Sequence, residues 1–376
     1  MLIYIVVLII FMAYIGDGVK MEIRKVQKLG YSTIVVSLPR NWVKEKNLKK
    51  GDSVIVRVDE DGNLRIEPYE AEGGKRKREQ YVIDVSQIKS PGLVKRILIG
   101  NYVLGHDNII FLNKNERLSP QVLKEIQDAI SRLAAMEIVE QDLHKVVVQC
   151  FIDPTKFRLT GLIRRMYTLI FSMLEAVQEY LKDFDQNVLM QVINMENEAD
   201  RLYWLIVRQI LLAQKSWRVA KEIGVDHPYH IIGNRALAKS LEEICDRIED
   251  VANELNRIQP ENIEKFKEVI AILDSILGDL KELLSLSMMA FIELDITKAN
   301  DILNTLKVFR DRIKELDTNF ITYIKDPLIL SVFRVIVSCI MRIADNADGI
   351  AEITINRALE MPSKICRWEV VEETAE

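Results

Sequence analysis

A short motif in the second half of the chain occurs twice at one fixed offset. Each copy pairs a proline with an arginine seven positions later and an aspartate eleven positions after that. Three residue types of different chemistry that keep one spacing indicate an internal repeat. The second copy lies ninety-nine positions after the first, so Pro228, Arg235 and Asp246 correspond to Pro327, Arg334 and Asp345.

Each copy predicts the last helix of a longer helical unit. Proline fits the first turn of a helix, and apolar residues then recur at helical spacing. Two amphipathic stretches precede each copy, at 160–182 and 187–214 and again at 261–294 and 297–325. The apolar stripes consist of Leu237, Leu241, Ile244, Ile248, Val251 and Leu255 in the first copy, and of Ile336, Ile340, Ile343, Ala347 and Ile350 in the second.

A lone helix cannot bury such a stripe, so the repeats predict three-helix bundles that pack together. The predicted fold class is therefore mainly α. It has two tandem three-helix bundles, at 158–259 and 260–360, and a tail at 361–376. A small β-rich domain and a small α/β module precede them.

Paired carboxylates mark the first repeat. Glu242 and Asp246 are four residues apart and project from one helical face, as do Glu196 and Asp200 on the preceding helix. Two interpretations remain open, a solvated acidic face offset by Lys and Arg, or a site for a hard cation such as Mg, Mn or Fe. A ferritin-type di-iron site would need Glu-x-x-His pairs, which these stretches lack.

The second repeat departs from this pattern. Met341 stands where Glu242 stood, and Lys307 stands where Glu196 stood. We expect Lys307 to supply an internal cation there, so that a second metal site is empty or weak. The carboxylates that remain are Asp311, Asp345 and Asp348.

The closing helices read Glu242-Glu243-Ile244-Cys245-Asp246 and Met341-Arg342-Ile343-Ala344-Asp345. From about residue 158 to 359 the chain resembles the PhoU-type phosphate-uptake regulators, whose closing helix typically reads Glu-Arg-Ile-Gly-Asp. The resemblance implies a cytoplasmic protein that restrains phosphate uptake by acting on phosphate transporters or sensor kinases. It also implies a divalent or iron cation, chiefly in the first repeat, on carboxylates drawn from Glu196, Asp200, Glu242, Asp246, Asp311 and Asp345.

The segment at 21–69 has a different character. Short β-type runs at 32–38, 53–58 and 64–67 alternate with turn residues, and a short helix opens at Pro39. Eight basic residues face two acidic ones between Glu22 and Lys50. In a chain of net charge −5, this concentration indicates either a contact surface for nucleic-acid phosphates or a solvated surface.

Nearly the whole segment is covered by the runs Arg24-Lys25-Val26-Gln27-Lys28-Leu29-Gly30, Ser37-Leu38-Pro39-Arg40, Leu48-Lys49-Lys50-Gly51-Asp52 and Asp61-Gly62-Asn63-Leu64. They resemble the AbrB/SpoVT swapped-hairpin family, which includes antitoxins. Its members form dimers, because one such segment has too small a core to stand alone. The resemblance implies DNA contacts by Arg24, Lys25, Lys28 and Arg40. At Tyr31-Ser32-Thr33 many members carry a further Arg, so the DNA specificity is expected to differ.

Two further segments link these regions. Residues 70–80 predict a flexible basic linker. Residues 81–153 alternate apolar runs at 81–85, 108–112 and 146–151 with helical patterns at 91–103 and 120–136. This order predicts a small α/β module that acts as a spacer, dimerisation or sensor element.

The first twenty residues are mostly apolar. The continuous run to Ile15 is shorter than the about 20 residues that span a bilayer, and it lacks the positive start of a secretory signal. We favour a start codon assigned too far upstream, with Met21 as the natural start and no stable membrane span. The alternative is a membrane-tethering segment.

The residues outside these motifs indicate no catalytic site. The four cysteines are dispersed with no Cys-x-x-Cys, and the four histidines are scattered. We therefore expect no enzyme. Three hypotheses remain: a cytoplasmic, phosphate-responsive regulator that binds DNA as a homodimer, an adaptor for a phosphate transporter or sensor kinase with DNA binding secondary, and a carboxylate-bridged metalloenzyme.

Overall fold

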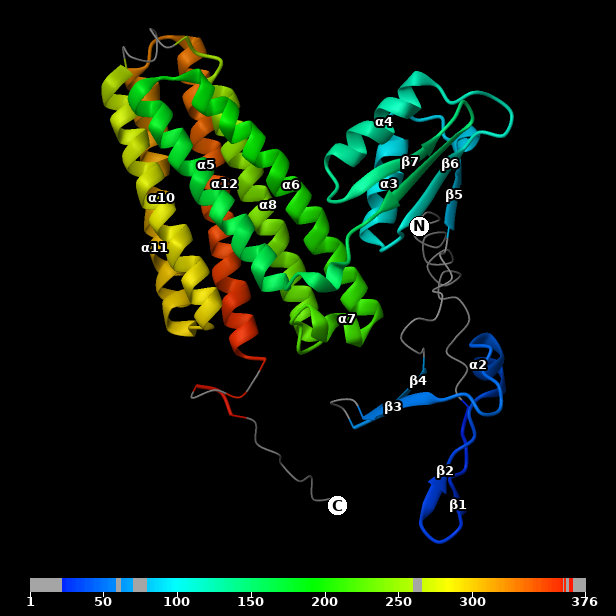
Figure 1. The fold of residues 1–376 in the computed structure, drawn as a ribbon. Helices are drawn as coiled ribbons and strands as arrows, with labels where there is room; N and C mark the ends of the chain where they lie inside the picture. The colour runs from blue at the N-terminus through cyan, green and yellow to red at the C-terminus, as the bar shows by residue number, and fades with distance from the viewer. Residues whose placement is uncertain are drawn as a thin grey trace, which may run out of the picture. The chain divides into compact units, whose positions relative to one another are not determined.

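The computed structural model describes residues 22–58, 62–69, 80–259, 266–360, 362 and 365–367. The chain divides into two compact units, residues 1–77 and 78–376 (Figure 1). The apolar leader and most of the predicted linker and tail lie outside the described residues. The described part of the chain is mostly helical, with small β-sheets and a mixed α/β module.

The N-terminal unit, residues 1–77, contains two antiparallel hairpins and one short helix. Gly30 has a φ of +69° in the first turn, a conformation that costs glycine little. The predicted helix begins after Pro39, but the first strand was not predicted. The elements are β1 (Gln27–Leu29), β2 (Thr33–Val35), α2 (Arg40–Glu45), β3 (Val54–Val58) and β4 (Leu64–Pro68).

The α/β module forms the first part of the second unit. Its four-stranded sheet has the order β5-β6-β8-β7, in which only the β5 and β6 pair is parallel. Along β6 and β8 buried residues alternate with half-buried ones, and the buried set packs with Leu98 and Ile126 of the helices. The elements are β5 (Gln80–Asp84), α3 (Leu93–Val103), β6 (Asn108–Leu112), α4 (Pro120–Ser131), β7 (Met136–Gln141) and β8 (Lys145–Cys150).

The fourth strand of this sheet, β7, corrects the sequence prediction. The helix expected over 120–136 ends at Ser131, and Ala135 takes a φ of +54° before the chain turns into β7. Met136 and Ile138 then pack in the core of the module. They lie two residues apart on one face of β7, as strand residues do, although the sequence prediction placed Met136 at the end of a helix and Ile138 in a loop.

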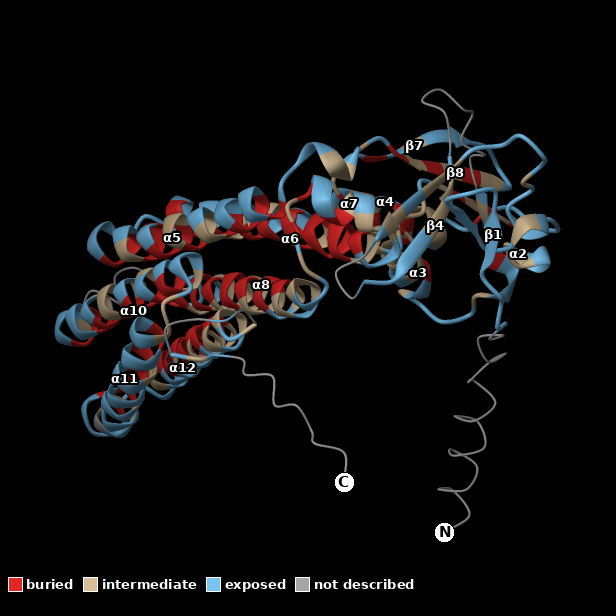
Figure 2. Ribbon diagram, turned by 90° about the horizontal axis from the view of Figure 1, so that it is seen from below, coloured by how far each residue is buried: buried red, intermediate tan, exposed pale blue. Residues whose placement is uncertain are grey.

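The helical region consists of two sets of three long helices. In the first set α5, α6 and α8 contact one another, and in the second α10, α11 and α12 do the same. The sets meet where α8 packs on α12 and α5 on α10, around one continuous core (Figure 2). The helices are α5 (Leu159–Asp183), α6 (Gln186–Lys215), the short unpredicted α7 (Trp217–Glu222), α8 (Tyr229–Leu255), α10 (Lys267–Glu293), α11 (Ile296–Tyr323) and α12 (Pro327–Ala358).

The two predicted apolar stripes are confirmed, because every residue in them is buried. The helix starts are also where the prolines predict them. Pro228 precedes the first residue of α8, and Pro327 is the first residue of α12. Asp326 caps α12 by accepting hydrogen bonds from the amides of Leu328 and Ile329, at 2.9 and 3.2 Å.

α12 is also the one described helix long and apolar enough to cross a membrane by length and composition alone. Half of its most apolar window is buried inside the protein, where α12 contacts α8, α10 and α11. A buried core helix meets the same criterion, so this is weak evidence for a membrane span.

The α/β module is attached to α6 through a buried arginine. Arg208 is 1% exposed, and its guanidinium donates to the carbonyl oxygen of Tyr102 and pairs with Asp107. Farther along α6, the Lys215 ammonium donates to the carbonyl oxygen of Leu104 at 2.7 Å. These contacts place the end of α3 against α6.

Candidate metal centre and nucleic-acid surface

Three carboxylates converge between α6 and α8. Glu196 and Asp200 lie one helical turn apart on α6, and Asp246 lies on α8. One oxygen from each lies within 4.8 Å of one oxygen from each of the others. We call these three residues the carboxylate triad. Glu196 and Asp200 are buried, and Asp246 is half-buried.

Two members of the triad, Glu196 and Asp246, form no hydrogen bond or ion pair with a described residue. Glu196 is the more deeply buried of the two, at 7% exposed. A buried carboxylate without a partner is costly in its charged form. Binding of either a proton or a cation would therefore stabilise this side chain.

Asp200 has an arginine partner from outside the helical region. The Arg132 Nη1 lies 2.6 Å from Oδ2 of Asp200. Arg132 follows the last residue of α4 in the α/β module, and the next residue of α6, Arg201, donates from Nε to the Ser131 carbonyl oxygen at 2.7 Å. The end of α4 thus lies directly on the triad.

Electrostatics in the triad favour neutralisation. Burial, aided by the charges of Asp200 and Glu249, raises the pKa of Glu196 to about 7. Burial also raises the pKa of Asp200, although Arg132 opposes that shift. The pKa of Asp246 is raised by burial and by the charge of Asp200. Three carboxyl groups that resist ionisation together would release protons when a cation binds.

Glu242, which the sequence analysis grouped with these three carboxylates, is not among those whose oxygens lie within 4.8 Å of one another, although burial and the charges of Asp246 and Asp200 help to raise its pKa. The Lys239 Nζ lies 2.6 Å from Oε2 of Glu242 and forms a second ion pair, at 3.4 Å, with Glu243. Burial raises the pKa of Glu242, while the hydrogen bond from Lys239 opposes the shift. Because both residues lie on α8 at helical spacing, this lysine holds the Glu242 carboxylate on its own helix.

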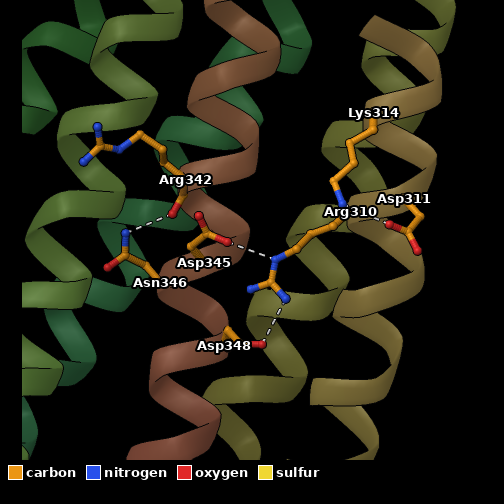
Figure 3. Close-up of polar contacts among 7 residues, drawn as sticks. All are labelled: Arg310, Asp311, Lys314, Arg342, Asp345, Asn346 and Asp348. Carbon is orange, nitrogen blue, oxygen red and sulfur yellow. Dashed lines mark hydrogen bonds and ion pairs between the residues drawn. The ribbon is translucent and has the colours of Figure 1, made fainter. Parts of the chain in front are cut away.

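The second repeat neutralises its carboxylates internally, but with a residue that we did not predict. Arg310 on α11 reaches Asp345 from Nε at 2.9 Å and Asp348 from Nη1 at 3.1 Å (Figure 3). Lys307, which we expected to be this cation, is exposed and forms no ion pair with a described carboxylate. Asp311 pairs instead with Lys314, on the other side of Arg310 from Asp345 (Figure 3).

The donor set of the triad fits a hard cation. It offers oxygen only, from two adjacent helices, as Mg²⁺, Mn²⁺ and related ions prefer. The unpartnered Glu196 carboxylate points into the same cluster. The triad could therefore hold a metal ion, with Glu196, Asp200 and Asp246 as protein ligands and water in the remaining positions. In the second repeat, Asp345 and Asp348 already pair with Arg310, and Asp311 pairs with Lys314.

The predicted DNA-binding residues lie on the surface of the N-terminal unit. Arg24 and Lys25 precede β1, Lys28 lies within β1, and Arg40 is the first residue of α2. All four are exposed. Arg24 forms an ion pair with Glu22, and the Asp52 carboxylate accepts a hydrogen bond from the Lys49 amide at 2.7 Å in the Lys-Gly-Asp turn.

Sequence reasoning missed Arg132 and Arg310. Arg132 lies 68 residues before Asp200, and the module that carries it had no predicted contact with the helices. Arg310 left a weak signal, since it is half-buried on α11 and lies beside Asp311, which we had singled out. An arginine at a half-buried helical position often has a carboxylate partner across the interface.

Two protein families match parts of this chain. The PhoU domain matches residues 163–255, which include the triad and Glu242. The family described as antidote-toxin recognition MazE, bacterial antitoxin, matches residues 27–73, which include Lys28 and Arg40. No curated protein and no solved structure matches the chain. The protein thus combines a PhoU domain with an N-terminal swapped-hairpin domain of the MazE/AbrB type, and both are regulatory rather than catalytic domains.

Proposed function

We propose that this combination of a MazE/AbrB-type domain and a PhoU domain makes the protein a phosphate-responsive regulator in the cytoplasm. It binds DNA as a dimer through the N-terminal unit and controls phosphate uptake through the helical region. The observation that carries the proposal is that the two matched families occur on one chain, at residues 27–73 and 163–255. The first supplies a way to bind DNA, and the second suggests phosphate regulation.

Burial supports the dimer. No described residue of the N-terminal unit is buried, and apolar side chains such as Ile34 (71% exposed) and Val58 (69% exposed) face solvent. Two hairpins without a buried core are not stable in isolation. A second copy that exchanges or stacks hairpins would cover these side chains, so a homodimer through this unit is the simplest functional form.

The charge of the unit supports DNA as its ligand. Arg24, Lys25, Lys28 and Arg40 are exposed and are spread over the first hairpin and the start of α2. A dimer doubles these charges on one particle. Because each phosphate contact releases counterions, binding through such a surface weakens steeply as salt rises.

A metal ion is the second part of the proposal. The triad of Glu196, Asp200 and Asp246 binds one divalent or iron cation, and the second repeat binds such a cation weakly or not at all. The bound cation would link the two helices that close the first repeat, α6 and α8. The conformation of the helical region would then depend on the cellular concentration of this cation as well as on partner proteins.

The DNA-binding role is tested by fluorescence anisotropy with promoter DNA at several salt concentrations. Arg24→Ala and Arg40→Ala should each weaken binding to every sequence and lower the salt slope by about one. Arg65→Ala is the matched control, since Arg65 is an exposed arginine of the second hairpin and lies outside the four predicted contact residues.

Unchanged affinity and an unchanged salt slope in both variants would contradict the assignment. If the wild-type protein showed no salt-dependent DNA binding at all, the adaptor hypothesis would replace it. In that case the helical region would act on a phosphate transporter or sensor kinase, and DNA binding would be secondary.

A further inference from the structure

Arg132 is the cation that lies beside the triad in this structure. Its Nη1 lies 2.6 Å from Oδ2 of Asp200, and one oxygen of Asp200 lies within 4.8 Å of Glu196 and Asp246 oxygens. The guanidinium therefore adds a positive charge at the edge of the cluster and uses one acceptor of a prospective ligand. Neither Glu196 nor Asp246 forms an ion pair with a described residue, so the triad is only partly neutralised.

A metal ion and this guanidinium would compete. A cation bound to all three carboxylates would lie close to the Arg132 guanidinium, which is 2.6 Å from Asp200, and the two positive charges would repel each other. The Arg132 side chain is 42% exposed, so it can leave the cluster and be hydrated by water. Asp200 is 8% exposed and cannot follow it.

We propose that Arg132 is the resident cation of the triad and that metal binding displaces it, which links metal occupancy to the docking of the end of α4. This inference rests on the metal site of the proposed function. By reciprocity, whatever holds the end of α4 against α6 weakens metal binding, and whatever frees it strengthens metal binding. The α/β module is then a sensor of metal occupancy.

The displacement is local. Arg208 remains buried between Tyr102 and Asp107, and Lys215 remains bonded to Leu104, so the α3 side of the module stays on α6. What loosens is Arg132, which follows the last residue of α4, and the turn that leads from it into β7. Arg201 still donates to the Ser131 carbonyl, which limits the movement to a few residues around Arg132.

Calorimetric titration of the full chain with Mn²⁺ tests the competition. Arg132→Gln should bind Mn²⁺ about tenfold more tightly than wild type, a coupling in the range common between linked sites. Arg132→Lys keeps the charge and should fall between the two. Arg117→Gln is the control, since Arg117 is an exposed arginine in the same module that makes no ion pair with a described residue.

Hydrogen exchange gives a second readout that does not depend on the variant folding normally. In wild-type protein, Mn²⁺ should speed exchange of the backbone amides at 131–136 while it slows exchange around Asp246 on α8. Equal Mn²⁺ affinity in wild type and Arg132→Gln, or slower exchange at 131–136, would overturn this inference and leave the metal site standing. No Mn²⁺ binding by any of the proteins would overturn both.

Discussion

At the scale of single residues, the chemistry of the helical region depends on which carboxylates have a partner. Glu242 has Lys239, Asp345 has Arg310 and Asp200 has Arg132, whereas Glu196 has none among the described residues. A four-residue spacing predicts which carboxylates share a helical face. It does not predict which lysine or arginine will reach them from another element.

The unpartnered Glu196 predicts an unusual pH dependence. Burial raises its pKa to about 7 in the folded protein, against an ordinary value of 4.5. Between these two pH values the folded state keeps a proton that the unfolded state has lost. The free energy of unfolding should therefore fall as pH rises from about 4.5 to 7, by at most about 3 kcal/mol from this group.

Thermal unfolding at pH 5 and pH 8, with a chelator present, tests this. In Glu196→Gln the free energy of unfolding should fall less between pH 5 and pH 8, and this variant should be more stable than wild type at pH 8. Asp200, Asp246 and Glu249 also face this group and keep part of the slope. Glu179→Gln, at an exposed position on α5, should behave as wild type. An equal decline in wild type and Glu196→Gln would remove Glu196 from the explanation.

The difference in which carboxylates form ion pairs also predicts that the two repeats bind metal unequally. Titration with Mn²⁺ should give one principal class of site, which Asp246→Ala abolishes because it removes the α8 ligand. Asp345→Ala should leave it nearly unchanged, since Asp345 pairs with Arg310 in the other repeat. Two equal sites in the wild-type protein, or strong binding by Asp246→Ala, would contradict this assignment.

At the scale of elements, the sequence predicted the long helices well and the small elements less well. The stripes of α8 and α12 have one period over many turns, so their buried faces could be read directly. β1 has three residues, α7 has six, and β7 follows a turn at Ala135 that no glycine or proline announces. Short elements take their structure from tertiary contacts rather than from a local period.

The attachment of the α/β module to α6 predicts an asymmetry between two substitutions. Asp107→Ala leaves the Arg208 guanidinium buried with a carbonyl but no counter-charge, and should cost at least about 2 kcal/mol of unfolding free energy. Arg208→Met removes the buried charge itself and leaves Asp107, which is 57% exposed, to be hydrated. Arg208→Met should therefore lower the unfolding free energy by less than Asp107→Ala does.

Urea unfolding of the two variants and of the double variant measures this difference. The double variant should resemble Arg208→Met, because no unpaired buried charge remains in either. If Asp107→Ala were as stable as wild type, the Arg208 contact would contribute little to holding the module on α6.

At the scale of the whole molecule, the two units differ in how their stability arises. The second unit has its own continuous cores, whereas the described part of the N-terminal unit has no buried residue. The resemblance to swapped-hairpin proteins predicted this difference, since such a segment needs a second copy. Which residues a partner copy covers depends on contacts between chains, which a single sequence does not reveal.

The central claim is that one protein joins DNA binding to phosphate regulation. Chromatin immunoprecipitation of the full chain from cells grown in high and low phosphate tests it most directly. We expect enrichment at the promoters of phosphate-uptake genes that changes with phosphate supply and is lost in the Arg24→Ala, Arg40→Ala double variant. Enrichment that ignores phosphate supply, or no enrichment above that of the double variant, would contradict the claim.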